Sequence, residues 1–343
     1  MLMRMLWHRR GDAAQTVDGL RVESFEESKV NQVLGLIRSC ATLSEAVVPY
    51  SVASFRAAYL GPGSRPGRDI TVLTRRRRAV GVALVSTRRQ YLAGGRAYLE
   101  VLYVEPRYPG PGPIRVLVAT SREKLLADGL PLAGMFTFLD DRTMRAEQAC
   151  LEDMGFTRLR RCRYLVFSPP RDYPRPRFPE EFRLVRETIP GNEAQVAARF
   201  NQAFMPPSLI PAVPENFRPL PGDVWLIRDG ALFLYDGREL AGCVQVLRHY
   251  EGRTAMTFVA RLGVVAGYRG RGLGRQLLRA AIHMGREHGF ESAKLTVYSD
   301  TPDAEHIYRS EGFTEHSCTS ELSWTWDAGA APGAFPDVAS PAP

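Results

Sequence analysis

Lysine is almost absent from this sequence, although the chain carries a formal charge of +8. It occurs only at Lys29, Lys124 and Lys294, so arginine supplies nearly all of the positive charge. This bias is more typical of a GC-rich coding sequence than of a nucleic-acid-binding surface. The densest run, Arg75–Arg78, lies between two apolar β-like stretches, which predicts an exposed hairpin tip in preference to a phosphate-binding patch. We expect no nucleic-acid partner.

Paired cysteines and long apolar runs are also missing. No segment approaches the roughly 18 apolar residues of a membrane span, and the first apolar stretch is too short for a signal peptide. We therefore expect no membrane partner and a cytoplasmic location. The cysteines lack the short paired spacings of a metal site or a disulfide framework, which predicts no metal and reduced, mostly buried thiols at Cys40, Cys150, Cys162, Cys243 and Cys318.

The length of the chain, 343 residues, exceeds what one hydrophobic core usually supports. A stretch rich in Pro and Arg, residues 169–179, cannot sustain a helix or a central strand and divides the chain almost in half. We predict an N-terminal domain at 1–168, this linker, a C-terminal domain at 180–327, and a disordered tail at 328–343 that is rich in Ala, Gly and Pro.

The C-terminal half alternates between strand and helix periods. A long helix is expected to end at Gly289, which has the position of a C-cap glycine. A short helix and a final pair of strands should complete the domain. The predicted elements are a strand at 182–186, a helix at 192–204, a three-stranded antiparallel meander at 231–235, 240–248 and 254–265, the long helix at 273–288, a strand at 293–298 and the short helix at 302–311.

The N-terminal half repeats this order of elements. Aligning Tyr108 with Tyr268 gives an offset of 160 residues (268 minus 108). The same offset aligns three pairs of glycines, namely Gly110 with Gly270, Gly112 with Gly272, and Gly129 with Gly289. The two halves therefore have the pattern of a tandem duplication.

The loop before the long helix carries three glycines on alternate positions, in the sequence Tyr-Arg-Gly-Arg-Gly-Leu-Gly-Arg of residues 268–275. Glycine lets a backbone approach a ligand closely, and the unpaired N–H groups of a first helical turn attract phosphate. No Gly-Lys-Ser/Thr follows, so this is not a Walker loop, and the spacing does not match the dinucleotide fingerprint. The loop favours a pyrophosphate without a bound magnesium.

This region resembles the GNAT superfamily of N-acetyltransferases. The coenzyme A loop of that family reads Arg/Gln-x-x-Gly-x-Gly/Ala, which Arg269, Gly272 and Gly274 match. The strands on either side of the long helix, and the Ile-Tyr and Gly-Phe pairs at 307–308 and 312–313, stand where the family has them. The resemblance implies an α/β (α+β) fold of two tandem domains, each a mixed, mainly antiparallel sheet flanked by helices.

The resemblance also implies roles for single residues. Tyr308 would protonate the thiolate of coenzyme A as it leaves, the alternative being an aromatic that only fills space between helix and sheet. The backbone of Leu262, Gly263 and Val264 would hold the pantetheine arm as an added strand. The loop would bind the pyrophosphate, which makes the remaining cofactor-binding candidates Arg269, Gly270, Arg271, Gly272, Leu273, Gly274 and Arg275.

The N-terminal half resembles a degenerate copy of this domain. Pro109 replaces Arg269, and proline lacks the N–H group that a pyrophosphate needs. Matching the two Gly-Phe pairs places Leu151 opposite Tyr308. We expect this half to bind no coenzyme, as in tandem GNAT proteins of the mycothiol synthase or aminoglycoside acetyltransferase kind.

These features together predict an acetyl-CoA-dependent N-acetyltransferase that acts on an amine, more readily a small molecule than a protein. The bound amine would attack the thioester directly. A non-catalytic acyl-CoA-binding sensor or scaffold is the alternative, because strand 254–265 contains no carboxylate to act as a general base. The acceptor and the oligomeric state stay open, and weak candidates for the base are Asp223, Asp236, Glu239 and His249.

Overall fold

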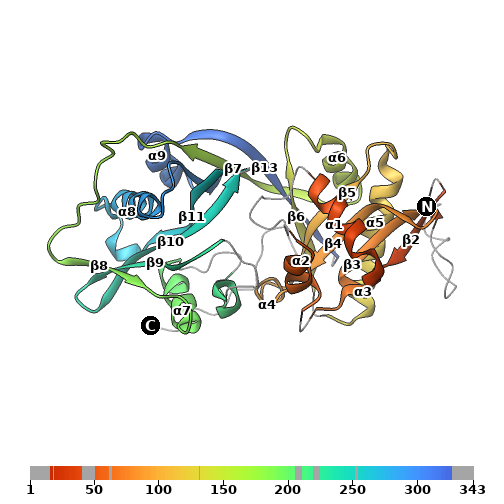
Figure 1. The fold of residues 1–343 in the computed structure, drawn as a ribbon, viewed down its shortest axis with the longest axis horizontal. Coiled ribbons are helices and arrows are strands. Elements are labelled where there is room, and N and C mark those ends of the chain that lie inside the picture. Colours follow the sequence, from red (N-terminus) through yellow and green to blue (C-terminus); the bar gives the residue numbers. More distant parts are fainter. Residues whose placement is uncertain are drawn as a thin grey trace.

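The computed structural model describes residues 16–17, 19–40, 51–61, 64–130, 132–204, 211–218, 225–251 and 254–326. The predicted tail at 328–343 lies outside the described residues. Thirteen strands form one continuous sheet, in the order β1-β2-β3-β4-β5-β6-β13-β7-β12-β11-β10-β9-β8. The sheet is mixed and mainly antiparallel, and helices flank both of its faces, which confirms the predicted fold class (Figure 1).

Each half repeats one order of elements along the chain. The first half contains β1 (Thr16–Val17), β2 (Leu20–Ser24), η1 (Glu27–Lys29), α1 (Val30–Ser39), α2 (Val52–Tyr59), α3 (Pro66–Asp69), β3 (Ile70–Arg75), β4 (Arg78–Ser86), α4 (Arg89–Ala93), β5 (Arg96–Val104), α5 (Pro111–Ala127), β6 (Gly134–Asp140), α6 (Arg145–Asp153) and β7 (Thr157–Phe167). The second half contains β8 (Phe182–Glu187), α7 (Glu193–Ala203), η3 (Pro214–Phe217), β9 (Leu226–Asp236), β10 (Glu239–Glu251), β11 (Thr254–Val264), η4 (Ala266–Tyr268), α8 (Leu273–Glu287), β12 (Ala293–Tyr298), α9 (Pro302–Ser310) and β13 (Thr314–Thr325).

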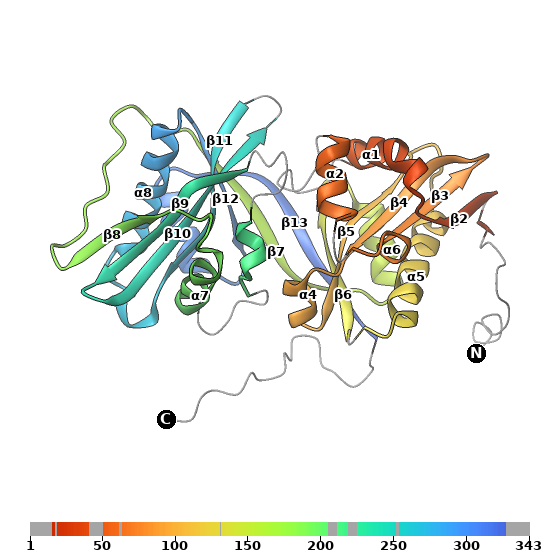
Figure 2. The same cartoon turned by 60° about the horizontal axis from the view of Figure 1, so that its bottom comes forward.

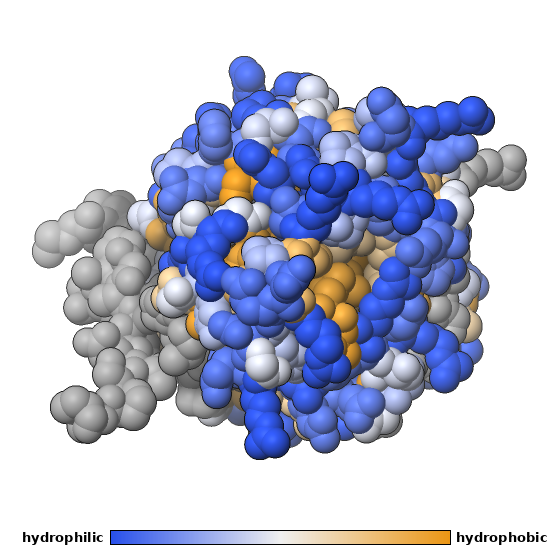
Figure 3. Space-filling view, turned by 90° about the vertical axis from the view of Figure 1, so that its left-hand side faces the viewer, coloured by the Kyte–Doolittle hydropathy of each residue, from blue (hydrophilic) through white to orange (hydrophobic). Residues whose placement is uncertain are grey.

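Apolar side chains fill the space on both faces of the sheet in each half. In the second half, one core cluster joins the sheet to α8 and α9, and another joins the opposite face to α7 and η3. In the first half, α5 and α6 cover one face while α1 and α2 cover the other. The end of the second half that faces away from the first shows an apolar hollow edged by hydrophilic side chains (Figure 3).

The last strand of each half lies beside the other half. β7 of the first half pairs with β12, and β13 of the second half pairs with β6 on one side and β7 on the other. Figure 2 shows β7 and β13 crossing between the two halves. The predicted final pair of strands in the second half is therefore wrong. Residues Thr314–Thr325 form a single strand of 12 residues, and both of its partners belong to the first half.

The segment between the halves has an irregular backbone over residues 169–179 and packs on the second half. Tyr173 is buried, and its hydroxyl donates to Glu311 Oε2 over 2.6 Å. The guanidinium of Arg286 donates to the carbonyl oxygen of Pro169 over 2.8 Å. The domain limits stay a prediction, because the shared sheet continues across them.

Three further expectations concern charge, thiols and apolar runs. Arg76 and Arg77 form the exposed turn between β3 and β4 with positive φ angles of 50° and 69°, which confirms the predicted hairpin tip. All five cysteines are free and buried, as predicted. None of the helices in the described part of the chain has the length and apolar character needed to cross a membrane.

Candidate active site

The sheet opens beside the predicted coenzyme loop. The parallel strands β11 and β12 pair only over Thr257–Val259 and Ala293–Leu295. Beyond this point β11 continues to Val264 and β12 to Tyr298 without a shared register. Ala260 is an extra residue of β11 relative to β10, and such a β-bulge bends a strand away from its neighbour. The end of β11 therefore has β10 on one side and an open edge on the other.

Backbone groups of β11 face this open edge. The N–H of Val265 donates to Ala241 O over 2.9 Å, so the alternation of an antiparallel ladder directs Gly263 toward β10 as well. The N–H and C=O groups of Leu262 and Val264 then point away from β10. Of the three predicted pantetheine contacts, the backbone of Leu262 and Val264 is thus placed to pair with an extended ligand, whereas that of Gly263 is not.

The glycine loop presents a run of free backbone donors. Gly270 and Gly272 have φ angles of 76° and 75°, which other residues rarely adopt, and α8 begins at Leu273. The first helical bond runs from Gln276 N–H to Gly272 O over 3.3 Å. Among the described residues, none accepts a hydrogen bond from the N–H groups of residues 270–275. Free N–H donors at and just before a helix N-terminus attract anions.

The arginine side chains of the loop are held by the protein itself. Arg269 Nε donates to Val264 O over 3.1 Å, and Arg271 Nη2 lies 2.7 Å from Glu181 Oε1. Arg275 Nε lies 3.2 Å from Glu311 Oε1, and its Nη2 donates to Ser310 Oγ over 3.0 Å. These contacts fix the loop, so its anion-binding capacity rests mainly on the backbone.

Gly274 connects the loop to the open edge. A Cβ atom at this position would lie 3.6 Å from Ile307 Cδ1 on α9 and 3.7 Å from Val264 Cγ2 on β11. The first turn of α8 therefore lies against α9 and the end of β11, so the glycine loop is adjacent to the open edge.

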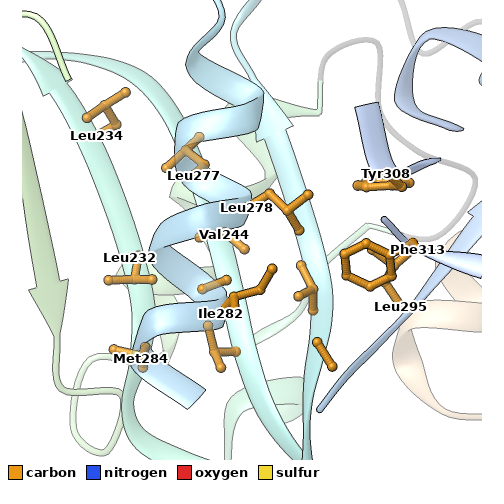
Figure 4. Packing of buried hydrophobic residues seen from close by; sticks show 14 of the residues in the cluster. Leu232, Leu234, Val244, Leu277, Leu278, Ile282, Met284, Leu295, Tyr308 and Phe313 are labelled. Carbon is orange, nitrogen blue, oxygen red and sulfur yellow. The ribbon is translucent and has the colours of Figure 1, made fainter. Parts of the chain in front are cut away.

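Tyr308 lies on α9, directly after Ile307. Its ring packs at the edge of the cluster that contains Leu278, and its centroid is 6.2 Å from that of Phe313 (Figure 4). No described residue forms a hydrogen bond with the hydroxyl group, and burial raises the pKa of the phenol to about 12. The phenol therefore stays protonated at neutral pH. This position suits a proton donor and a packing residue alike, so the role of Tyr308 stays a prediction.

The α7 face of β11 carries a charged residue that the sequence analysis did not single out. Arg261 follows the bulge, and its Nη1 donates to Gln245 Oε1 over 3.4 Å. On the same face, a Cβ atom at Gly263 would lie 3.0 Å from Phe204 Cζ, so Phe204 covers the strand there. The only sequence signal was an arginine within an otherwise apolar strand.

The candidates for a general base are not gathered at the open edge. Asp236 and Glu239 flank the turn between β9 and β10. His249 is buried opposite Met256, on the paired side of the bulge, with its Nε2 3.4 Å from Lys294 Nζ. Asp223 lies outside the described residues, and no group of three metal-ligating side chains converges within the described chain.

Comparison with known proteins agrees with this geometry. The sequence profile of the acetyltransferase (GNAT) family matches residues 197–313. A mycothiol acetyltransferase from Corynebacterium glutamicum (strain R) is 36% identical over 90 residues, which is 26% of this chain and 30% of that relative. The corresponding protein of strain ATCC 13032 is 34% identical over 90 residues. The chain thus matches less than a third of the length of these curated relatives.

Solved structures share the fold along most of the chain. An N-acetyltransferase from Sphaerobacter thermophilus has a TM-score of 0.64 at 18% identity, covering 91% of this chain and 97% of that one. A tandem GNAT protein from the clavulanic acid biosynthesis pathway also has a TM-score of 0.64, at 16% identity, covering 91% of this chain and all of the other. The chain thus shares the fold of this tandem protein. Residues 197–313 are similar to the acetyltransferase (GNAT) family.

Proposed function

We propose that the second half binds acetyl-CoA and transfers its acetyl group to the amine of a small molecule. One observation carries the proposal: the six free N–H groups of residues 270–275 lead, past Gly274, to the open backbone edge of β11. A pyrophosphate followed by an extended chain with amide groups fits this sequence of donors. The partial similarity to mycothiol acetyltransferases favours a small-molecule acceptor.

The proposed reaction is a direct transfer. The amine nitrogen attacks the thioester carbonyl, a C–N bond forms, and the C–S bond breaks. The amine loses one proton to solvent, and the departing thiolate takes one from Tyr308, which regains it from solvent. Holding both reactants side by side supplies much of the acceleration. Tyr308 adds general acid catalysis, with its raised pKa keeping the donor protonated.

The test measures thiol release from acetyl-CoA with a panel of amines: amino acids, amino sugars, polyamines and a peptide N-terminus. Calorimetry on the same protein measures acetyl-CoA binding, with one site per chain expected. Turnover with at least one amine supports the transferase. Binding without turnover across the panel would favour the sensor or scaffold instead. Absence of binding would refute the site.

A further inference from the structure

Arg261 is a half-buried cation on the α7 face of β11. Its guanidinium lies 5.7 Å from the ring centroid of Phe217 and makes one long hydrogen bond to the buried amide of Gln245. Burial lowers the pKa of the guanidinium, whereas Cys243 and, more weakly, Tyr91 and Tyr298 raise it. An arginine has five N–H donors, so most of its hydrogen-bonding capacity is unused here.

Other inward-facing arginines of the sheet have acidic partners. Arg160 Nε lies 2.7 Å from Glu321 Oε2, and Arg163 Nη1 lies 2.6 Å from Glu305 Oε2. In the described part of the chain, no carboxylate forms an ion pair with Arg261. A half-buried guanidinium that no described carboxylate occupies keeps donors available for an anionic group of a ligand.

The position of Arg261 connects it with the proposed reaction. It directly precedes Leu262 at the open edge, and its side chain lies on the same face as Gly263, away from α8. Tyr91, which influences its pKa, lies on α4 of the first half. Figures 1 and 2 show α4 on the side of the first half that faces the second. Both halves therefore border the space in front of Arg261.

We propose that Arg261, assisted by Gln245, binds a carboxylate of the acceptor, so that the acceptor is an amine that also carries a carboxylate. This deepens the proposed function and rests on it. A single guanidinium balances one negative charge, which suits a carboxylate better than a phosphate monoester with about −1.5 to −2 charges at neutral pH. The planar guanidinium also matches a carboxylate with two parallel hydrogen bonds.

The first test compares acceptors that differ in the carboxylate. They are amino acids, their amides, their decarboxylated amines, and phosphoethanolamine, which carries a phosphate in its place. We expect kcat/KM to favour the amino acids by about 10- to 100-fold, the size of charge-assisted hydrogen bonds.

Arg261→Gln should abolish the preference mainly through KM and leave acetyl-CoA affinity unchanged. Arg183→Gln, an exposed arginine on β8, is the matched control. Equal use of amino acids and amides, or preference for phosphoethanolamine, would overturn the carboxylate.

A second test does not need turnover. Amino acids and their amides are titrated into the coenzyme A complexes of the wild type and Arg261→Gln, with binding followed by calorimetry. Binding of the amino acids that is lost in the variant supports the proposal even if the transferase assay fails. Equal affinities of acids and amides refute it.

Discussion

The two halves of this protein share a framework but not the groups that carry chemistry. Both have a β-bulge on the strand before the long helix, at Glu100 and at Ala260, which stand 160 residues apart like the paired glycines. In both, the following parallel strand pairs over only three residues before the sheet opens. The opening of the sheet is thus a property of the fold. What differs is the set of groups placed around it.

The loop at the start of the long helix differs in conformation. In the second half α8 begins at Leu273, after two glycines with positive φ. In the first half α5 begins at Pro111, two residues earlier at the same offset, and Gly112 is helical. Proline fits the first turn of a helix but gives no N–H group. The first half therefore has neither the donor run nor the backbone shape of the second.

At the β-bulge the first half, and not the second, carries an ionisable side chain. Glu100 in the first half is 7% exposed, and its Oε2 has no hydrogen-bond partner within the described chain. Burial raises the pKa of this carboxyl, although Arg88 and a hydrogen bond from Tyr59 oppose the rise. The second half has Ala260 at this place. A carboxylate on this strand and the proposed coenzyme loop thus occur in different halves.

Replacing the loop of the second half by that of the first should have the largest effect on acetyl-CoA binding. Residues 269–274 are replaced by the sequence of residues 109–114, Pro-Gly-Pro-Gly-Pro-Ile. Acetyl-CoA binding should be lost, because two of the six free N–H groups, those of positions 271 and 273, disappear and Ile in place of Gly274 collides with the Ile307 side chain. Calorimetry measures the binding, and circular dichroism checks folding.

The reciprocal exchange is the control. Placing the sequence of residues 269–274 at 109–114 should leave acetyl-CoA binding in the second half unchanged. If the first exchange gives a folded protein with normal affinity, the coenzyme binds elsewhere, and the difference between the loops has no functional meaning.

Tyr308→Phe tests whether the second half has a general acid where the first has Leu151. The ring can still pack beside Phe313, so acetyl-CoA affinity should persist while kcat falls by about 10²- to 10⁴-fold. Because burial raises the pKa of Tyr308 to about 12, its proton is retained through pH 10, and the wild type should show no alkaline fall in kcat from this group up to that pH. Tyr235→Phe on β9 is the control. Full turnover in Tyr308→Phe, with chemistry limiting the rate, would make Tyr308 a packing residue.

The sequence predicted most of the helices and strands, because local residue patterns determine them. The meander, the long helix and the repeat offset follow from hydrophobic period, turn residues and glycine spacing, and the structure confirms the elements. Pro111 and Pro113 lie in the first turn of α5, where proline is accepted although it interrupts a helix elsewhere.

Partners that are distant in the chain could not be predicted in this way. The buried run at Cys318–Ser323 of β13 indicates a central strand but not that β6 and β7 are its neighbours. Alternation specifies which face of a strand is buried and leaves its partner undefined. The same limit applies to Arg261, because only the fold shows that none of the described carboxylates pairs with it.

Substituting one glycine in each half tests the difference in loop conformation with the smallest expected effect. Gly272→Ala introduces a Cβ at a φ angle of 75°, which should lower the free energy of unfolding by about 1–2 kcal/mol. Gly112→Ala, at the matching offset but in the first turn of α5, should instead raise it by about 0.4–1 kcal/mol, because alanine restricts the unfolded chain without strain in the helix. Urea unfolding followed by circular dichroism measures both midpoints under one set of conditions. Shifts of the same sign would show that the two loops do not differ as described. Opposite signs would mean that matching glycines have diverged in backbone conformation, and that the coenzyme loop depends on a left-handed residue which the first half no longer needs.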